Sequence, residues 1–346
     1  MTAEVAEKFH DLARRRAANG YAPVYARMAE VCATDPLALG LAARARPGQN
    51  PPSLLLGAVH YLLAGEPDHP MARFYPALTG RPAPDPDTDD PAADLLAFIR
   101  THADRIGRLV AERLVQTHEV GRCAYLYPAL LAAQAHAGTP LAVVEVGASA
   151  GLTLVPDRYA YDYATGHLHG DPASPLVLSC ELRGPHRPPL DRRLDITWRA
   201  GIDLNPLNLQ AAEDRAWLRA LVWPDHPRRA ARLDAALQAA RRGPLPPIHR
   251  GDAAGTVGRV LEQAPPDATA AVFHTAVTAH FTEPMRAAWR DRLLELSKGR
   301  RILWLRAEPH EEPRLRFSDL QDGTVRSEVP LGGYHPHGEW LEWARE

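Results

Sequence analysis

The stretch at residues 141–152, Leu-Ala-Val-Val-Glu-Val-Gly-Ala-Ser-Ala-Gly-Leu, constrains the fold more than any other part of the chain. It opens with apolar, largely β-branched residues, which are typical of a buried parallel strand. Glu145 lies near the end of this strand, and the small residues Gly147, Ser149 and Gly151 follow at every second position. Small residues permit a tight turn and let a ligand approach the main chain. We therefore expect a strand, a turn and then a helix whose free N–H groups face a ligand.

Three interpretations of this turn are open. It resembles the first motif of class I S-adenosylmethionine-dependent methyltransferases, acidic-x-Gly-x-Gly-x-Gly, with Ser149 in place of the middle glycine. It also matches Gly-x-Ser-x-Gly, the nucleophile elbow of α/β-hydrolases, in which Ser149 would be the nucleophile. In the third interpretation it is a tight strand-to-helix turn without a ligand.

Residues 1–138 show helical periodicity and predict an N-terminal α-helical region, or cap. Within it, residues 54–63 are apolar on all sides apart from His60, as in a helix buried inside a bundle. We interpret His60 as a hydrogen-bonded core histidine rather than a ligand. Gly138-Thr-Pro140 interrupts the pattern and marks the predicted domain boundary, with a second domain at 139–346.

In the second domain, strands alternate with helices, which predicts an α/β fold with a Rossmann-like, doubly wound, mostly parallel sheet. An irregular insertion at about 157–191 interrupts the alternation, and the tail from residue 315 predicts two final antiparallel strands. After the first strand, further strands are expected at 195–203, 269–275 and 301–306, and residues 247–254 are expected to form a short strand followed by a glycine and an acid. Helices are expected at 211–222, 228–242 and 282–297.

Polar residues come at the predicted carboxyl ends of these strands: Glu145, Asp203, Asp252, His274 and Glu308. In a parallel sheet these ends share one edge, where ligands bind near the point at which the strand order reverses. The hydrolase interpretation fits less well, because an elbow needs several strands upstream and gives the acid before the first glycine no role.

The cofactor roles follow from the chemistry of these groups. The carboxylate of Asp203 offers two acceptor oxygens for ribose hydroxyls. Asp252, with Ala253, is expected to bind the adenine amino group. The resemblance to the first methyltransferase motif implies that Glu145, Gly147, Ser149 and Gly151 hold the methionine and ribose end of S-adenosylmethionine.

Segments spread over nearly the whole chain carry a closer resemblance: Pro51–Leu63, Glu119–Arg122, Glu145–Leu152, Trp198–Pro206, Trp217–Leu218, Val222–Pro224, Val272–Ala276 and His337–Trp340. In these segments the chain resembles domain-of-unknown-function family 2332, an uncharacterised and mainly actinobacterial family. This resemblance implies a Rossmann-like fold and brings no established reaction.

Three residues are candidates for catalysis of methyl transfer. His274 and Thr275 follow the fourth strand, where methyltransferases commonly present substrate-facing groups, and the pKa range of histidine suits a base. Glu308 could pair with an amine or guanidinium substrate. The alternative for His274 is a hydrogen-bonded strand end, and for Glu308 a structural contact that holds Arg306 or a loop.

Composition excludes several classes of function. A formal net charge of −2 does not indicate nucleic acid or an anionic membrane as a partner. The N-terminus lacks the apolar core of a signal peptide, and no apolar run is long enough to span a bilayer. The three cysteines have no metal spacing and fit a reducing cytoplasm.

The sequence does not predict a metal site. His335 and His337, with Glu308 and His310, are possible ligands, but the proline between the first two restricts their shared geometry.

Taken together, these features predict a cytoplasmic S-adenosylmethionine-dependent methyltransferase acting on a small molecule. The alternatives are a degenerate Rossmann protein that binds a nucleotide-like ligand or a partner without catalysis, and a serine hydrolase.

Overall fold

The computed structural model describes residues 2–116, 118–308, 311 and 314–344. By internal contacts, the chain divides into unit 1, Met1–Thr117 with Asn208–Leu233, and unit 2, His118–Leu207 with Asp234–Glu346. This division differs from the predicted boundary at residue 138, because unit 2 begins before that residue and unit 1 includes a segment after it. The helix before that boundary belongs to unit 2, and a later helix belongs to unit 1.

Unit 1 is helical, as the periodicity predicts. Its α-helices are α1 (Thr2–Ala17), α2 (Pro23–Thr34), α3 (Pro36–Ala42), α4 (Pro51–Leu63), α5 (Pro76–Thr79), α6 (Ala92–Thr101), α7 (Ala103–Glu112), α9 (Ala212–Ala220) and the first part of α10 (Pro227–Ala240). Helix α4 begins at a cap in which Asn50 Oδ1 accepts from Ser53 N, with Pro51 in the first turn.

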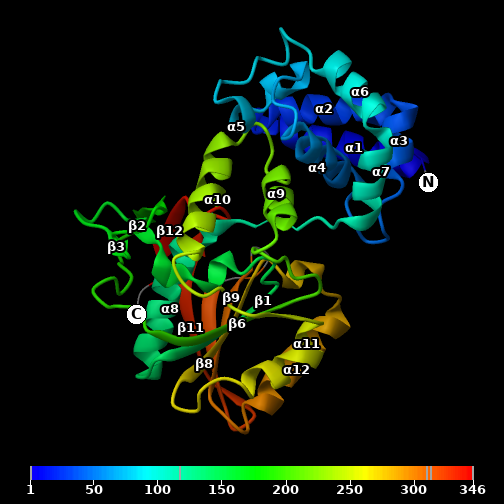
Figure 1. Ribbon diagram of the computed structural model, residues 1–346. Helices are drawn as coiled ribbons and strands as arrows, with labels where there is room; N and C mark the ends of the chain where they lie inside the picture. The colour runs from blue at the N-terminus through cyan, green and yellow to red at the C-terminus, as the bar shows by residue number, and fades with distance from the viewer. Residues whose placement is uncertain (1, 117, 309–310, 312–313, 345–346) are drawn as a thin grey trace. The chain divides into compact units, whose positions relative to one another are not determined.

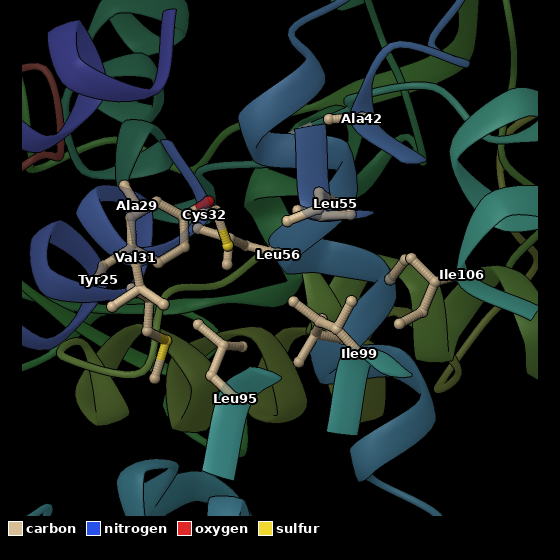
Figure 2. Packing of buried hydrophobic residues seen from close by; sticks show 14 of the residues in the cluster. Tyr25, Ala29, Val31, Cys32, Ala42, Leu55, Leu56, Leu95, Ile99 and Ile106 are labelled. Carbon is tan, nitrogen blue, oxygen red and sulfur yellow. The ribbon is translucent and has the colours of Figure 1, made fainter. Parts of the chain in front are cut away.

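An apolar core joins these helices. Figure 2 shows Leu55 and Leu56 of α4 among side chains from neighbouring helices, including Ile99 and Ile106. Burying each such side chain stabilises the fold by about 1.5–3 kcal/mol. Trp217 of α9 is fully buried in this same core, which explains why α9 belongs with the N-terminal helices.

His60 is a core histidine, as interpreted from the sequence. It is 6% exposed, and its Nδ1 lies 3.0 Å from the carbonyl oxygen of Ala220 in α9. Burial lowers the pKa of His60 to about 4, so the ring is neutral at pH 7.

Unit 2 contains a nine-stranded sheet in the order β5-β12-β11-β10-β9-β8-β1-β6-β7. Strands β7, β6, β1, β8 and β9 run parallel, whereas β10, β11 and β12 are antiparallel to their predecessors. The strands are β1 (Leu141–Val146), β5 (Glu181–Arg183), β6 (Ile196–Asp203), β7 (Ile248–Arg250), β8 (Thr269–Thr275), β9 (Ile302–Ala307), β10 (Leu315–Gln321), β11 (Thr324–Tyr334) and β12 (Trp340–Trp343).

The fold is thus α/β with a large, mostly parallel sheet. Two expectations need correction. The tail forms three antiparallel strands rather than two, because the Gly338 turn lets the chain return and pair β12 with β11. The insertion at 157–191 is not irregular: it forms a small sheet, β3-β2-β4, of β2 (Ala160–Asp162), β3 (His169–Gly170) and β4 (Val177–Ser179), and then adds β5 to the main sheet.

The two faces of the main sheet differ. In Figure 1, α11 (Ala253–Leu261) and α12 (Glu283–Leu296) lie on one side of it and α8 (Cys123–Ala137) on the other. Val144 and Val146 of β1 pack in an apolar cluster with side chains of α11 and α12. Because side chains alternate along a strand, Val143 and Glu145 point to the α8 face.

Helix α8 ends at Gly138, whose φ of 72° is left-handed, just where the sequence predicts a break. Tyr127 of α8 stacks on Tyr161 of β2, with ring centroids 4.4 Å apart, and Tyr163 donates a 2.7 Å hydrogen bond to Ala124 O. These contacts place α8 in unit 2.

Candidate functional site

The turn after β1 is built from left-handed residues. The φ angles are 75° at Gly147, 51° at Ser149 and 72° at Gly151. The predicted helix does not follow. Gly151 instead precedes a 3-10 helix, Leu152–Leu154, because left-handed residues and the nearby Pro156 are incompatible with a continuing α-helix.

Asp203, at the end of β6, links this turn to the segment that follows β6. Its Oδ2 accepts from Ser149 N at 2.8 Å, and its Oδ1 accepts from Asn205 N at 2.8 Å. Leu207 N in turn donates to Ser149 O at 3.0 Å. The carboxylate therefore fixes the shape of the turn, in addition to any contact with a ligand.

Glu145 is a buried carboxyl group beside the turn, 2% exposed. Its Oε1 accepts from Thr153 Oγ1 at 2.5 Å, and its Oε2 has no hydrogen-bond partner among the described residues. Burial raises the pKa of Glu145 to about 8, although Thr153 and Arg122 oppose the shift. The group is thus mostly protonated at pH 7.

Ser149 carries a second buried oxygen of this kind. The residue is 6% exposed, and its Oγ makes no hydrogen bond within the described part of the chain. A buried polar atom without a partner costs about 1–3 kcal/mol. Two such atoms, one near the end of β1 and one on the turn after it, provide hydrogen-bonding capacity that a ligand can use.

Arg122 and Thr275 lie at the same edge. Arg122 Nη1 donates to both the carbonyl oxygen and Oγ1 of Thr275, each at 2.9 Å. Glu145 is opposite Phe273 in the pairing of β1 with β8, so Thr275, two residues further on, points to the same face. Arg122, Glu145 and Thr275 therefore share the α8 face of the sheet.

His274 points to the other face, toward α12. It is 1% exposed; Trp304 Nε1 donates to its Nε2 at 3.0 Å, and its Nδ1 lies 2.6 Å from Glu308 Oε1. Nδ1 therefore carries the proton, and both ring nitrogens are engaged. This geometry corresponds to the hydrogen-bonded strand end considered above and argues against the base suggested for His274.

Glu308 is the centre of that cluster. Its Oε1 also accepts from Val277 N at 2.9 Å and Thr278 N at 3.2 Å. Burial raises its pKa, but the hydrogen bonds from His274, Val277 and Thr278 outweigh burial and leave the net pKa below the ordinary value. Glu308 thus anchors the chain after β8, a different role from the pairing with a substrate amine that the sequence suggests.

Asp252 and Ala253 lie after β7, two strands from β1. Asp252 is the N-cap of α11, and its Oδ1 accepts from Gly255 N at 2.8 Å. The side chain is exposed and Ala253 is half-buried. A capping role accounts for the aspartate without a ligand.

The histidines of the tail meet the segment before α8. His337 Nδ1 lies 2.9 Å from Glu119 Oε2, and Glu119 is 6% exposed. Among the described residues, no group of three or more His, Cys, Asp or Glu side chains is placed to hold a metal ion. His310 lies outside the described residues.

Two further findings concern the described residues as a whole. None of their helices has both the length and the apolar character required to cross a membrane. One surface pocket in unit 1, lined by His69, Arg73 and Arg81 among others, contains none of the predicted site residues.

Comparison with known families gives one match. A family model described as "Uncharacterized protein conserved in bacteria (DUF2332)" matches residues 6–343. The chain belongs to this family. No curated protein and no solved structure matches the DUF2332 chain.

In this DUF2332 protein, segments far apart in sequence come together at the carboxyl edge of the sheet. Residues 119–122 contact His337 of the tail and Thr275 of β8. Thr153 and Val277 also belong to this edge and are absent from the sequence-based candidates. Neither stands in a recognisable motif, so only the tertiary structure reveals them.

Proposed function

We propose that unit 2 of this DUF2332 protein binds S-adenosylmethionine and transfers its methyl group to a small molecule. The observation that carries the proposal is the pair of unpartnered buried oxygens, Glu145 Oε2 near the end of β1 and Ser149 Oγ on the turn that follows. Both are positioned to hydrogen-bond a polar ligand, and nothing in the described part of the protein uses them.

The strand order supports this location. The chain adds β6 and β7 on one side of β1, and β8 and β9 on the other. The order therefore reverses between β1 and β8, which is the place where open parallel sheets bind nucleotides and related cofactors. Gly147 lies at this reversal, and a Cβ added to it would approach Val277 Cγ2 to 2.5 Å.

In this proposal, Gly147, Ser149 and Gly151 hold the cofactor through the turn that they form, and Glu145 binds its polar end. A carboxylate has about four acceptor positions, so Asp203 can hold the turn and also accept from a ribose hydroxyl. When bound, the cofactor supplies an electrophilic methyl group on a sulfonium centre.

The other predicted site residues are proposed to lie at the adenine, at the acceptor or behind it. Asp252 and Ala253 are proposed at the adenine. Thr275, whose Oγ1 accepts from Arg122, is proposed to border the acceptor, whereas His274 and Glu308 support the chain behind it. Because His274 points away from Glu145, deprotonation of the acceptor is not assigned to it.

Calorimetric titration with S-adenosylmethionine and S-adenosylhomocysteine tests the proposal. We expect micromolar binding, about −8 kcal/mol, and at least about tenfold weaker binding in Asp203→Asn, which loses an acceptor for the turn. Asp162→Asn is the matched control, because that carboxylate accepts from Ala164 N in the small sheet. Folded protein that binds neither ligand would refute the proposal.

Two alternative functions predict different experimental results. Cofactor binding without turnover on any acceptor would favour a binding protein without catalysis. A hydrolase would be labelled at Ser149 by a fluorophosphonate probe, and Ser149→Gly would abolish labelling. The φ of 51° at Ser149 is compatible with an elbow, but no base contacts its Oγ within the described residues.

A further inference from the structure

Arg122 is a charged group held by neutral partners. Its two Nη1 donors go to the carbonyl oxygen and hydroxyl of Thr275, and in the described part of the protein no carboxylate forms an ion pair with it. A guanidinium has five N–H donors, so three remain on Nε and Nη2. Those donors match the fork geometry of a carboxylate.

Glu145 supplies a hydrogen-bond acceptor that complements the donors of Arg122. Its Oε2 is buried, lacks a partner and can accept a hydrogen bond from an ammonium group. The positive charge of Arg122 opposes the rise in the pKa of Glu145. They also share the α8 face of the sheet, through Thr275 for Arg122 and directly for Glu145.

We propose that this edge recognises an α-amino acid group, with Arg122 binding its carboxylate and Glu145 its ammonium. The inference rests on the proposed function only for the identity of the ligand. The amino acid group can belong to the cofactor or to a free amino acid. Arg122 stands outside the glycine-rich turn, on the segment that leads into α8.

A set of three ligands separates these sources. S-Adenosylhomocysteine carries the adenosyl and the α-amino acid groups, 5′-methylthioadenosine carries the adenosyl group alone, and L-methionine the amino acid alone. Wild-type protein is titrated with each by calorimetry. We expect S-adenosylhomocysteine to bind at least about thirtyfold more tightly than 5′-methylthioadenosine, because two charge-assisted contacts are lost.

Variants assign the contacts. Arg122→Gln and Glu145→Gln are each expected to weaken S-adenosylhomocysteine at least about tenfold and to leave 5′-methylthioadenosine within about twofold. Arg183→Gln is the matched control, because that exposed arginine pairs with Glu181 in β5. Thr275→Val tests whether fixing the guanidinium matters, since it removes one acceptor and keeps the charge. Circular dichroism and urea midpoints verify folding of each variant.

Proton release gives a second measurement. At pH 7, an ammonium beside Glu145 would favour the carboxylate, so binding should release a proton. Titration in phosphate and in Tris, whose ionisation enthalpies differ, detects this release. Glu145→Gln should abolish it.

The outcomes are distinct. If 5′-methylthioadenosine binds as tightly as S-adenosylhomocysteine, and Arg122→Gln changes both equally, the amino acid site is refuted while the cofactor proposal stands. If only L-methionine or another free amino acid binds, in an Arg122-dependent manner, the site stands and the cofactor proposal fails. If none of these ligands binds to folded protein, both are refuted.

Discussion

His274 and Glu308 form a buried hydrogen bond of 2.6 Å between the ends of the neighbouring strands β8 and β9. Trp304 Nε1 donates a hydrogen bond to the other ring nitrogen of His274. The same carboxylate holds the main chain at Val277 and Thr278, so the bond fixes the segment that follows β8. A histidine that the sequence suggests as a base thus stabilises the edge of the sheet.

We expect His274→Ala to lower the free energy of unfolding by about 2–4 kcal/mol, because it leaves Trp304 Nε1 unpartnered and removes a donor to the Glu308 carboxylate. Urea unfolding measures the loss. Binding of S-adenosylhomocysteine to the folded variant should change little, since His274 points away from Glu145. A variant of normal stability with abolished binding would contradict the structural role.

The buried carboxyl of Glu145 predicts a specific dependence of stability on pH. Its pKa is about 8 in the folded chain, against an ordinary value of 4.5 for a solvent-exposed glutamate, so the folded state holds a proton that the unfolded state releases. Stability should therefore fall as pH rises between these values, by at most about 1.4 kcal/mol per pH unit.

Glu145→Gln should remove this contribution. Urea unfolding of both proteins should be measured at pH 5, 6, 7 and 8. The free energy of unfolding of the variant, relative to that of the wild type, should increase as pH rises. The opposite trend, with the variant losing stability relative to the wild type toward pH 8, would mean that Glu145 is ionised and stabilised in the folded protein.

Ser149→Gly should be tolerated and should raise the free energy of unfolding by up to about 1 kcal/mol. Glycine adopts the left-handed φ of 51° without strain, and the substitution also removes a buried hydroxyl without a partner. Thermal unfolding would reveal the gain. Marked destabilisation would show that the hydroxyl makes a structural contact.

Gly147→Ala should destabilise the protein by about 2–4 kcal/mol. Its φ is 75°, and the new Cβ would come within 2.5 Å of Val277 Cγ2. Val277→Ala in the same chain should restore part of the loss, because it removes the clash but not the backbone strain. Gly299→Ala, where the nearest atom is 3.9 Å away, is the control and should change stability little.

The sequence predicts the main parallel strands of unit 2 in their order along the chain. The apolar runs at β1 and β8 are strong enough that the predicted strands agree with the observed Leu141–Val146 and Thr269–Thr275. Periodicity is a local property, so it also predicts the N-terminal helices. It misses the small sheet of the insertion, because strands of two or three residues carry no repeating pattern.

The role of each polar side chain was decided by tertiary structure. The sequence places Glu145 and His274 alike at strand ends, but the register of β1 and β8 sends them to opposite faces of the sheet. It also cannot show that Arg122 meets Thr275, 153 residues away, or that Glu119 meets His337. Spacing along the chain fixes which residues reach an edge, whereas strand pairing and burial decide which of them keep an atom available for a ligand.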